Sequence, residues 1–178
     1  SIHEQLDNFE KPINQYIYLM QLLENNETLF FKTISSDPAK YLPLVYTPTV
    51  GEACQKFGQV SRRPRGFYLS IKEKDNLKQI LRNWPEKDVR FTVVTDGGRI
   101  LGLGDLGIFG LGIPIGKLVL YTSCGGVPPE YTLPIVLDVG TNNEEFLNDP
   151  LYPGLKCKRI RGKEFDDFVA AFVEAMNE

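Results

Sequence analysis

The sequence places an arginine and a lysine where α/β proteins commonly bind anions. Arg99 lies in a glycine-rich turn after a β-branched and aromatic run, residues 89–94, and Lys117 is predicted in the first turn of a helix that follows Gly116. The carboxyl end of a strand and the N-terminus of a helix are the usual anion sites of such sheets. Spacing alone favours a simpler interpretation, in which Arg99 is a solvated charge in a turn and Lys117 lies on the surface of a helix.

Tyr46 begins a second unusual stretch, YTPTVG, at residues 46–51. Pro48 disfavours a helical conformation at the residue before it, and Thr49 is predicted to cap a helix that runs to Gly58. On pattern alone, Tyr46 is more simply a buried aromatic side chain in front of that cap. His3 is the only histidine, so proton transfer would have to use Lys, Tyr, Asp, Glu or Cys.

Two glycine motifs resemble nucleotide-binding loops but lack the necessary context. Residues 102–107 (GLGDLG) match G-x-G-x-x-G, yet residues 108–114 (IFGLGIP) are not predicted to form the regular helix that a dinucleotide site needs. Residues 112–117 (GIPIGK) are one residue too short for a phosphate-binding loop, and a leucine follows where Ser or Thr is required. The glycines instead predict tight turns and close approach of the backbone to a ligand.

Acidic and basic clusters have two interpretations each. Asp96, Asp105 and Asp138 could form a metal cluster, but each borders a strand or turn, where aspartate commonly accepts hydrogen bonds from nearby backbone, and we favour that role. The basic segment RRPR, residues 62–65, could bind an anion, although a local charge cluster on a loop is the simpler interpretation.

The elements that must position these residues are helices first and then alternating strands and helices. Apolar residues recur at three- and four-residue steps through residues 4–34, which predicts amphipathic helices. Strands are predicted at residues 67–71, 89–94 and 133–138, and helices at residues 75–82, 117–124 and 165–176. We therefore expect an α/β fold in which helices flank a parallel sheet, with an N-terminal helical segment over about residues 1–60 and an α/β core over about 61–178.

Composition excludes several classes of protein. The chain has 178 residues, 42% of them hydrophobic, and a formal net charge of −3, so nothing favours a nucleic-acid or anionic-membrane partner. Its unbroken apolar runs are shorter than a membrane span. The three cysteines form no C-x-x-C pair, which predicts reduced thiols in the cytoplasm, with the mitochondrial matrix as the other reducing compartment.

Five sequence blocks, in the same order and at similar spacing, resemble the malic enzymes of bacteria and eukaryotes. They cover nearly all of the chain from about Phe9 and comprise YTPTVGEAC (46–54), RRPRG (62–66), VTDGGRILGLGD (94–105), GIPIGKL (112–118) and LPIVLDVGTN (133–142). The resemblance implies the fold of the malate-binding N-terminal domain and the oxidative decarboxylation of L-malate to pyruvate and carbon dioxide. It also implies that residues 102–107 belong to the substrate loop and not to a nucleotide site.

The same resemblance implies roles for three residues. The tyrosine that opens YTPTVG, Tyr46, corresponds to the general acid, and the lysine of GIPIGKL, Lys117, to the general base. Arg99 corresponds to the arginine that binds a malate carboxylate, and it is also a candidate for contacting the cofactor. A phenol is protonated at neutral pH and can donate a proton, whereas a lysine amine acts as a base once burial or a neighbouring cation favours its neutral form.

The resemblance further implies NAD or NADP and a Mg²⁺ or Mn²⁺ ion in the full-length enzyme, which forms dimers or tetramers in this family. The metal ligands and the nicotinamide-binding domain of the family come after the region that residues 1–178 match, so we expect no metal ligand in this chain and no malate oxidation by it alone. Two alternatives stay open: a malolactic enzyme, which converts malate to lactate, and a dimerisation or regulatory module without catalysis. The latter would not need Tyr46, Arg99 and Lys117 together.

Overall fold

The computed structural model describes residues 1–56 and 65–177, and its first part is a layer of short helices. They are α1 (Ile2–Asp7), α2 (Pro12–Asn25), α3 (Glu27–Ser36), α4 (Pro38–Val45) and α5 (Thr49–Lys56). The prediction of helices through residues 4–34 is confirmed, although residues 8–11, between α1 and α2, are not helical. The predicted helix start at Thr49 is also confirmed, while its predicted end at Gly58 lies outside the described residues.

Polar side chains at the helix ends explain where the chain turns. The Asn26 side chain accepts a hydrogen bond from the Leu29 amide (3.0 Å), and that of Asp37 accepts one from the Lys40 amide (3.1 Å). Each bond satisfies an amide that has no partner within its helix, a contribution of about 1 kcal/mol. Pro38 directly after Asp37 begins α4, because a proline in the first turn forfeits no helical hydrogen bond.

A three-stranded parallel sheet forms the second part of the fold. Its strands, β1 (Phe67–Ser70), β3 (Thr132–Asp138) and β2 (Phe91–Thr95), lie in the order β1-β3-β2. The central strand β3 is buried from Leu133 to Asp138, as its unbroken apolar sequence predicts. All three predicted strands and their parallel arrangement are confirmed.

One face of the sheet is covered by the C-terminal helix α9 (Lys163–Met176). Alternate residues of β3 form a single apolar cluster with two phenylalanines of α9; the cluster includes Leu133, Ile135, Leu137, Phe168 and Phe172. The 3₁₀ segment η1 (Ile71–Asn76) and α6 (Leu77–Leu81) complete this layer. Fully burying one such side chain contributes about 1.5–3 kcal/mol, so this row contributes substantially to the stability of the layer.

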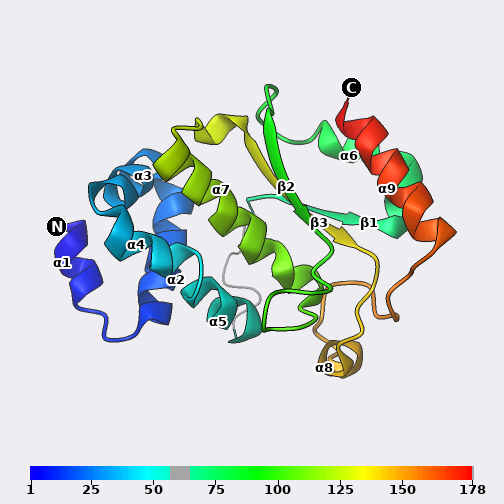
Figure 1. Cartoon of the computed structure of the whole chain (residues 1–178), viewed down its shortest axis with the longest axis horizontal. Coiled ribbons are helices and arrows are strands. Elements are labelled where there is room, and N and C mark those ends of the chain that lie inside the picture. The colour runs from blue at the N-terminus through cyan, green and yellow to red at the C-terminus, as the bar shows by residue number, and fades with distance from the viewer. Residues whose placement is uncertain (57–64, 178) are drawn as a thin grey trace.

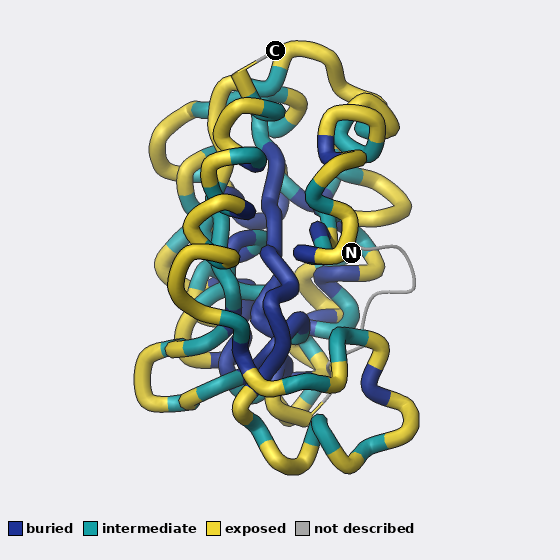
Figure 2. The backbone as a smooth tube through the Cα atoms, turned by 90° about the vertical axis from the view of Figure 1, so that its right-hand side faces the viewer, coloured by how far each residue is buried: buried dark blue, intermediate teal, exposed yellow. Residues whose placement is uncertain are grey.

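The other face packs against α7 (Gly112–Gly125), which separates the sheet from the N-terminal helices (Figure 1). Helices thus cover both faces, as expected for a parallel sheet. Figure 2 shows the buried backbone gathered in the middle of the molecule, with exposed segments around it.

Helix α7 begins earlier than the sequence predicts. Residues Gly107–Leu111 form a 3₁₀ turn, η2, and α7 starts at Gly112, which places Lys117 in the second turn and not the first. The prediction that residues 108–114 form no regular helix is therefore wrong for the last three. Pro114 lies within the first turn, where its missing N–H costs nothing.

The helical run Gly107–Gly125 is long and apolar enough to cross a membrane by length and composition. Within the described residues it packs against α3, α4 and α5 on one side and against β2 and β3 on the other. Burial on two sides requires an apolar surface nearly all round the helix, and this accounts for its composition. The remaining short elements are η3 (Pro129–Tyr131) and α8 (Glu144–Asn148).

Candidate active site

Tyr46 and Lys117 come from different helices and meet in space. Tyr46 follows the last residue of α4, and Lys117 lies on α7. The Lys117 Nζ is 5.7 Å from the centroid of the Tyr46 ring and 5.8 Å from that of the Tyr121 ring, one helical turn further along α7. The predicted acid and base are therefore neighbours, and the amine is flanked by two aromatic rings.

A glycine next to Lys117 allows this close approach. A Cβ atom at Gly116 would lie 2.7 Å from the Val45 carbonyl oxygen and 2.8 Å from Cδ2 of Tyr46. Any side chain at this position would push the end of α4 away from α7. Tyr46 is half-buried, and its carbonyl accepts a hydrogen bond from the Val50 amide (2.8 Å), which ties it to the start of α5.

Arg99 lies on the loop that follows β2 and is exposed. The loop closes on itself through paired backbone hydrogen bonds between Ile100 and Gly104 (2.9 and 3.0 Å), and its Leu103 side chain packs against Gly51 of α5. Arg99 makes no ion pair within the part of the chain that the structure describes. Among the same residues no hydrogen bond or ring contact joins Arg99 to Tyr46 or Lys117, so the structure brings two of the three predicted residues together.

The loop nevertheless borders the start of α7. Gly97 has a φ of 69°, and a Cβ there would lie 1.9 Å from the Gly107 carbonyl oxygen; a Cβ at Gly110 would lie 3.0 Å from the Gly97 Cα. Only glycine satisfies both the positive φ and the contact. In Figure 1 the loop lies between the N-terminal end of α7, α5 and α8. Arg99 is thus carried by a segment that is packed on η2, the 3₁₀ turn that leads into the helix bearing Lys117.

The three aspartates accept hydrogen bonds from nearby backbone, as predicted. Each side chain bonds the amide two residues later: Asp96 with Gly98 (2.9 Å), Asp105 with Gly107 (2.9 Å) and Asp138 with Gly140 (3.1 Å). Among residues 1–56 and 65–177, no three His, Cys, Asp or Glu side chains gather as metal ligands would. We therefore assign no metal step to the described residues.

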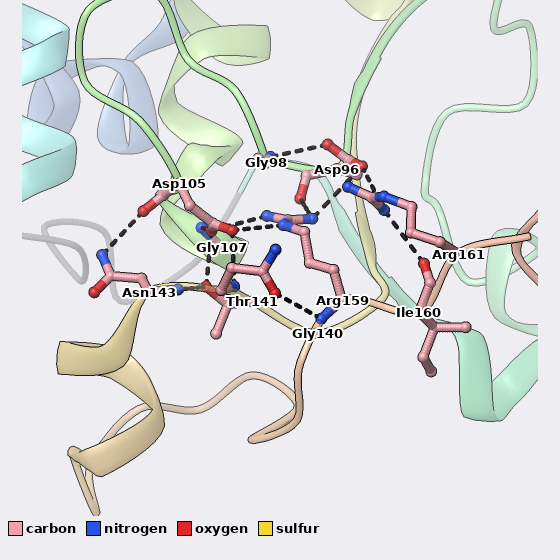
Figure 3. Close-up of polar contacts among 12 residues, drawn as sticks. Asp96, Gly98, Asp105, Gly107, Gly140, Thr141, Asn143, Arg159, Ile160 and Arg161 are labelled. Carbon is pink, nitrogen blue, oxygen red and sulfur yellow. Dashed lines mark hydrogen bonds and ion pairs between the residues drawn. The ribbon is translucent and has the colours of Figure 1, made fainter.

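Arg159 is the polar residue that the sequence does not reveal. Its side chain is 2% exposed, and its Nε and Nη2 donate to Oδ2 and Oδ1 of Asp105 (2.6 and 2.9 Å), while Nη1 donates to the Asp96 carbonyl oxygen (2.8 Å). Figure 3 shows the guanidinium between the two aspartates. Asp105 and Arg159 are 54 residues apart, and Arg159 lies among three other basic residues in 156–161, so no local signal marks it as buried.

Asp105 also accepts hydrogen bonds from the loop after β3. The Thr141 hydroxyl donates to Oδ1 (2.7 Å) and the Asn142 amide to Oδ2 (2.9 Å). Burial raises the pKa of Asp105, but the hydrogen bonds from Arg159, Asn142 and Thr141 outweigh it and lower that pKa to about 2. The carboxylate is therefore ionised at neutral pH and pairs with a buried cation.

The remaining predicted features lie elsewhere or have simple structural partners. Residues 62–64 of the basic segment lie outside the described residues, and Arg65 forms an ion pair with Glu27 of α3.

The three cysteines are free. Cys54 is buried against α7, and burial raises the pKa of its thiol to about 11. The motif at residues 102–107 leads into the 3₁₀ turn η2 and not directly into α7, and its aspartate is bound to Arg159, which differs from a dinucleotide loop that opens an α-helix at once.

Comparison with known proteins gives a consistent family match. Residues 23–178 match the family model "Malic enzyme, N-terminal domain". The mitochondrial NADP-dependent malic enzyme of Mus musculus is 54% identical over 172 residues, which are 97% of this chain and 28% of the relative. The NADP-dependent malic enzyme of Columba livia is 52% identical over 178 residues, covering 98% and 32%. The NAD-dependent malic enzyme of Idiomarina loihiensis is 53% identical over 172 residues, covering 97% and 31%. The chain thus spans about a third of the length of these relatives.

Proposed function

This chain belongs to the malic enzyme family, and from that premise we propose that it supplies the malate-binding side of an enzyme that oxidatively decarboxylates L-malate to pyruvate and carbon dioxide. In this proposal Tyr46 is the general acid, Lys117 is the general base and Arg99 binds a malate carboxylate. The observation that carries it is the contact between the Lys117 Nζ and the Tyr46 ring, 5.7 Å from amine to centroid, made by residues of separate helices. A purely structural module has no need of an amine and a phenol at one point.

Each of the three side chains has a task suited to its chemistry. In its neutral form, the Lys117 amine takes the proton from the C2 hydroxyl of malate as that carbon is oxidised. Loss of carbon dioxide leaves an enolate, and the Tyr46 phenol donates a proton to its carbon and so forms the methyl group of pyruvate. The planar Arg99 guanidinium binds a carboxylate through two parallel hydrogen bonds, a geometry that lysine cannot reproduce.

The oxidant in this proposal is NAD or NADP, with Mg²⁺ or Mn²⁺ as the divalent ion. The relatives named above include NADP-dependent and NAD-dependent enzymes at nearly equal identity, so similarity does not choose between the two nucleotides. The described residues hold neither a metal cluster nor a dinucleotide loop, and we derive no step through either group. Assembly into dimers or tetramers, and a cytoplasmic or mitochondrial location, are further parts of the proposal.

Substitution of the acid and the base tests the assignment. We expect Lys117→Ala and Tyr46→Phe each to lower kcat for malate oxidation by about 100-fold or more, the usual effect of losing a positioned proton-transfer group. The assay is the malate-dependent reduction of NAD or NADP with Mn²⁺, in the intact protein that contains this chain. Lys72→Ala, at an exposed lysine on η1, is the control and should leave kcat unchanged.

Two further results would contradict the proposal. Lactate instead of pyruvate as the product would indicate malolactic chemistry. Full activity in both the Lys117→Ala and Tyr46→Phe variants would exclude the proposed acid and base. We also expect the 178-residue chain alone to show no malate oxidation, because the family resemblance implies that the metal ligands and the nicotinamide-binding domain lie beyond the region that it matches.

A further inference from the structure

The loop between Asp96 and Asp105 carries Arg99 and has little structure of its own. Its internal hydrogen bonds are those of the Ile100–Gly104 turn and the bond from the Gly98 amide to the Asp96 side chain, and its Ile100 and Leu103 side chains pack against the N-terminal helices. Its exposed tip holds Gly102 and Gly104, both with positive φ and with no neighbouring atom within 4 Å of a Cβ placed on them. Glycines give such a segment many accessible conformations when nothing else fixes it. Because Ile100 and Leu103 anchor only the segment after Arg99, the position of Arg99 also depends on how the two ends of the loop are held.

Arg159 holds both ends. One nitrogen of its guanidinium donates to the carbonyl oxygen of Asp96, and two others bind the carboxylate of Asp105 in a bidentate pair (Figure 3). Because these two aspartates flank the loop, one planar group fixes the separation and direction of its ends. The Leu106 amide also donates to the Gly97 carbonyl (2.9 Å), which closes the base of the loop beside the guanidinium.

Arg159 is in turn fixed to the sheet. Its amide donates to the Asn142 side chain (3.1 Å), and the amide of Ile160 donates to the carbonyl of Val139 (2.9 Å), directly after β3. The Asn143 side chain donates to the Asp105 carbonyl oxygen (3.0 Å). Arg159 and Asp105, which together form the clamp, are thus both tied to the segment that leaves the buried central strand.

We infer that Arg159 and Asp105 are positioning residues for malate binding: they hold the loop so that Arg99 meets a carboxylate of the substrate without first having to be ordered. This inference rests on the proposed function, because it assigns Arg159 and Asp105 an effect only through Arg99. Neither residue contacts the substrate in this role. Ordering a mobile arginine and its loop during binding weakens affinity, and pre-ordering removes that loss.

The experiment is a mutant cycle between the clamp and Arg99, measured in the intact protein that contains this chain. We expect Asp105→Asn to raise the KM for malate about 5- to 10-fold, as loss of pre-ordering would. In an Arg99→Ala background, the same substitution should change the malate KM by less than about 2-fold, because residues that act through one another do not contribute additively.

Two further variants keep the test decisive. Thr141→Val removes one hydrogen bond to Asp105, together with the bond that the Asn143 amide donates to the Thr141 hydroxyl (3.1 Å), and we expect a smaller rise in malate KM. It replaces Asp105→Asn in the cycle if that variant does not fold. Arg161→Met is the matched control, since Arg161 is 53% exposed and reaches Oδ2 of Asp96 (3.4 Å) without bonding Asp105. Its malate KM should stay within about 2-fold of the unsubstituted protein.

The outcomes separate this inference from the function on which it rests. Equal effects of Asp105→Asn with and without Arg99 would mean a general structural role and would overturn the inference. The same holds if the malate KM does not change in Asp105→Asn. If Arg99→Ala leaves malate affinity untouched, or if the unsubstituted protein does not oxidise malate, the proposed function itself fails.

Discussion

Two regions of this molecule position candidate catalytic groups by different physical means. Tyr46 and Lys117 are placed by helix packing, with Gly116 allowing α4 and α7 to touch. Arg99 is carried on a glycine-rich loop whose ends are fixed by a buried guanidinium and a carboxylate. Packing fixes distance through many weak, non-directional contacts, whereas the clamp fixes direction through a few strong and charged ones. We therefore expect the contact between α4 and α7 to be sensitive to substitutions that change side-chain volume, and the loop of Arg99 to be sensitive to substitutions that change charge.

Removing the buried cation should have the largest effect on stability. Arg159→Met leaves the Asp105 carboxylate, 13% exposed, without its cationic partner, and we expect the free energy of unfolding to fall by about 3–5 kcal/mol. Arg161→Met, at an exposed ion pair with Asp96, should cost less than about 1 kcal/mol. Urea-induced unfolding of both variants provides the comparison. Similar losses in the two would show that burial does not distinguish these arginines.

Adding one methyl group should have an intermediate effect on the helical contact. Gly116→Ala places a Cβ against the Val45 carbonyl and the Tyr46 ring, and we expect a loss of about 1–3 kcal/mol together with a lower kcat. Gly125, the last residue of the same helix, has no atom within 4 Å of the place that a Cβ would occupy, so Gly125→Ala should be neutral or stabilise by up to about 1 kcal/mol. Thermal unfolding measures the stability of the two variants, and steady-state kinetics measure their kcat. A harmless Gly116→Ala would contradict the idea that α4 and α7 depend on this glycine.

Acidification, which weakens the ion pair between Asp105 and Arg159, should have the smallest of these effects on stability. The pKa of Asp105 is lowered from its usual 3.8 to about 2, so the stabilisation is complete above about pH 4 and is lost as the pH falls through about 2. We expect a loss on the order of 1–2 kcal/mol across that range. Urea unfolding between about pH 5 and pH 2 measures it. Other carboxylates also titrate in this pH range, so the free energy of unfolding of the unsubstituted protein is compared with that of Asp105→Asn at each pH. If the two free energies fall in parallel with pH, Asp105 does not contribute the expected stabilisation.

The sequence is sufficient for most of the fold because the relevant signals are local. The apolar run at residues 133–138 predicts a buried central strand, and the spacing of Phe168 and Phe172 predicts the inner face of α9. The backbone role of the three aspartates is equally local, since each bonds an amide two residues away. The start of α7 is missed because Pro114 and its flanking glycines resemble a loop, although proline is tolerated in a first turn.

The site is less predictable because its contacts are distant in sequence. The Tyr46–Lys117 pair follows from the family resemblance and not from spacing, which favoured a buried aromatic and a surface lysine. Arg159 is missed altogether, because its bidentate partner is 54 residues away and its basic neighbours look the same in a one-dimensional pattern. Burial of a charge is a property of the folded chain, and it becomes visible only once the loops after β2 and β3 are placed together.

The place of Arg159 along the chain links the clamp to the C-terminal helix. The segment that holds Arg159 leads directly into α9, whose Phe168 and Phe172 lie in the core against the sheet. Only residues 160–162 separate Arg159 from the start of α9, and the Arg159 guanidinium bonds both ends of the loop that bears Arg99. The guanidinium that holds the loop of Arg99 thus lies close in sequence to a helix that is anchored in the core.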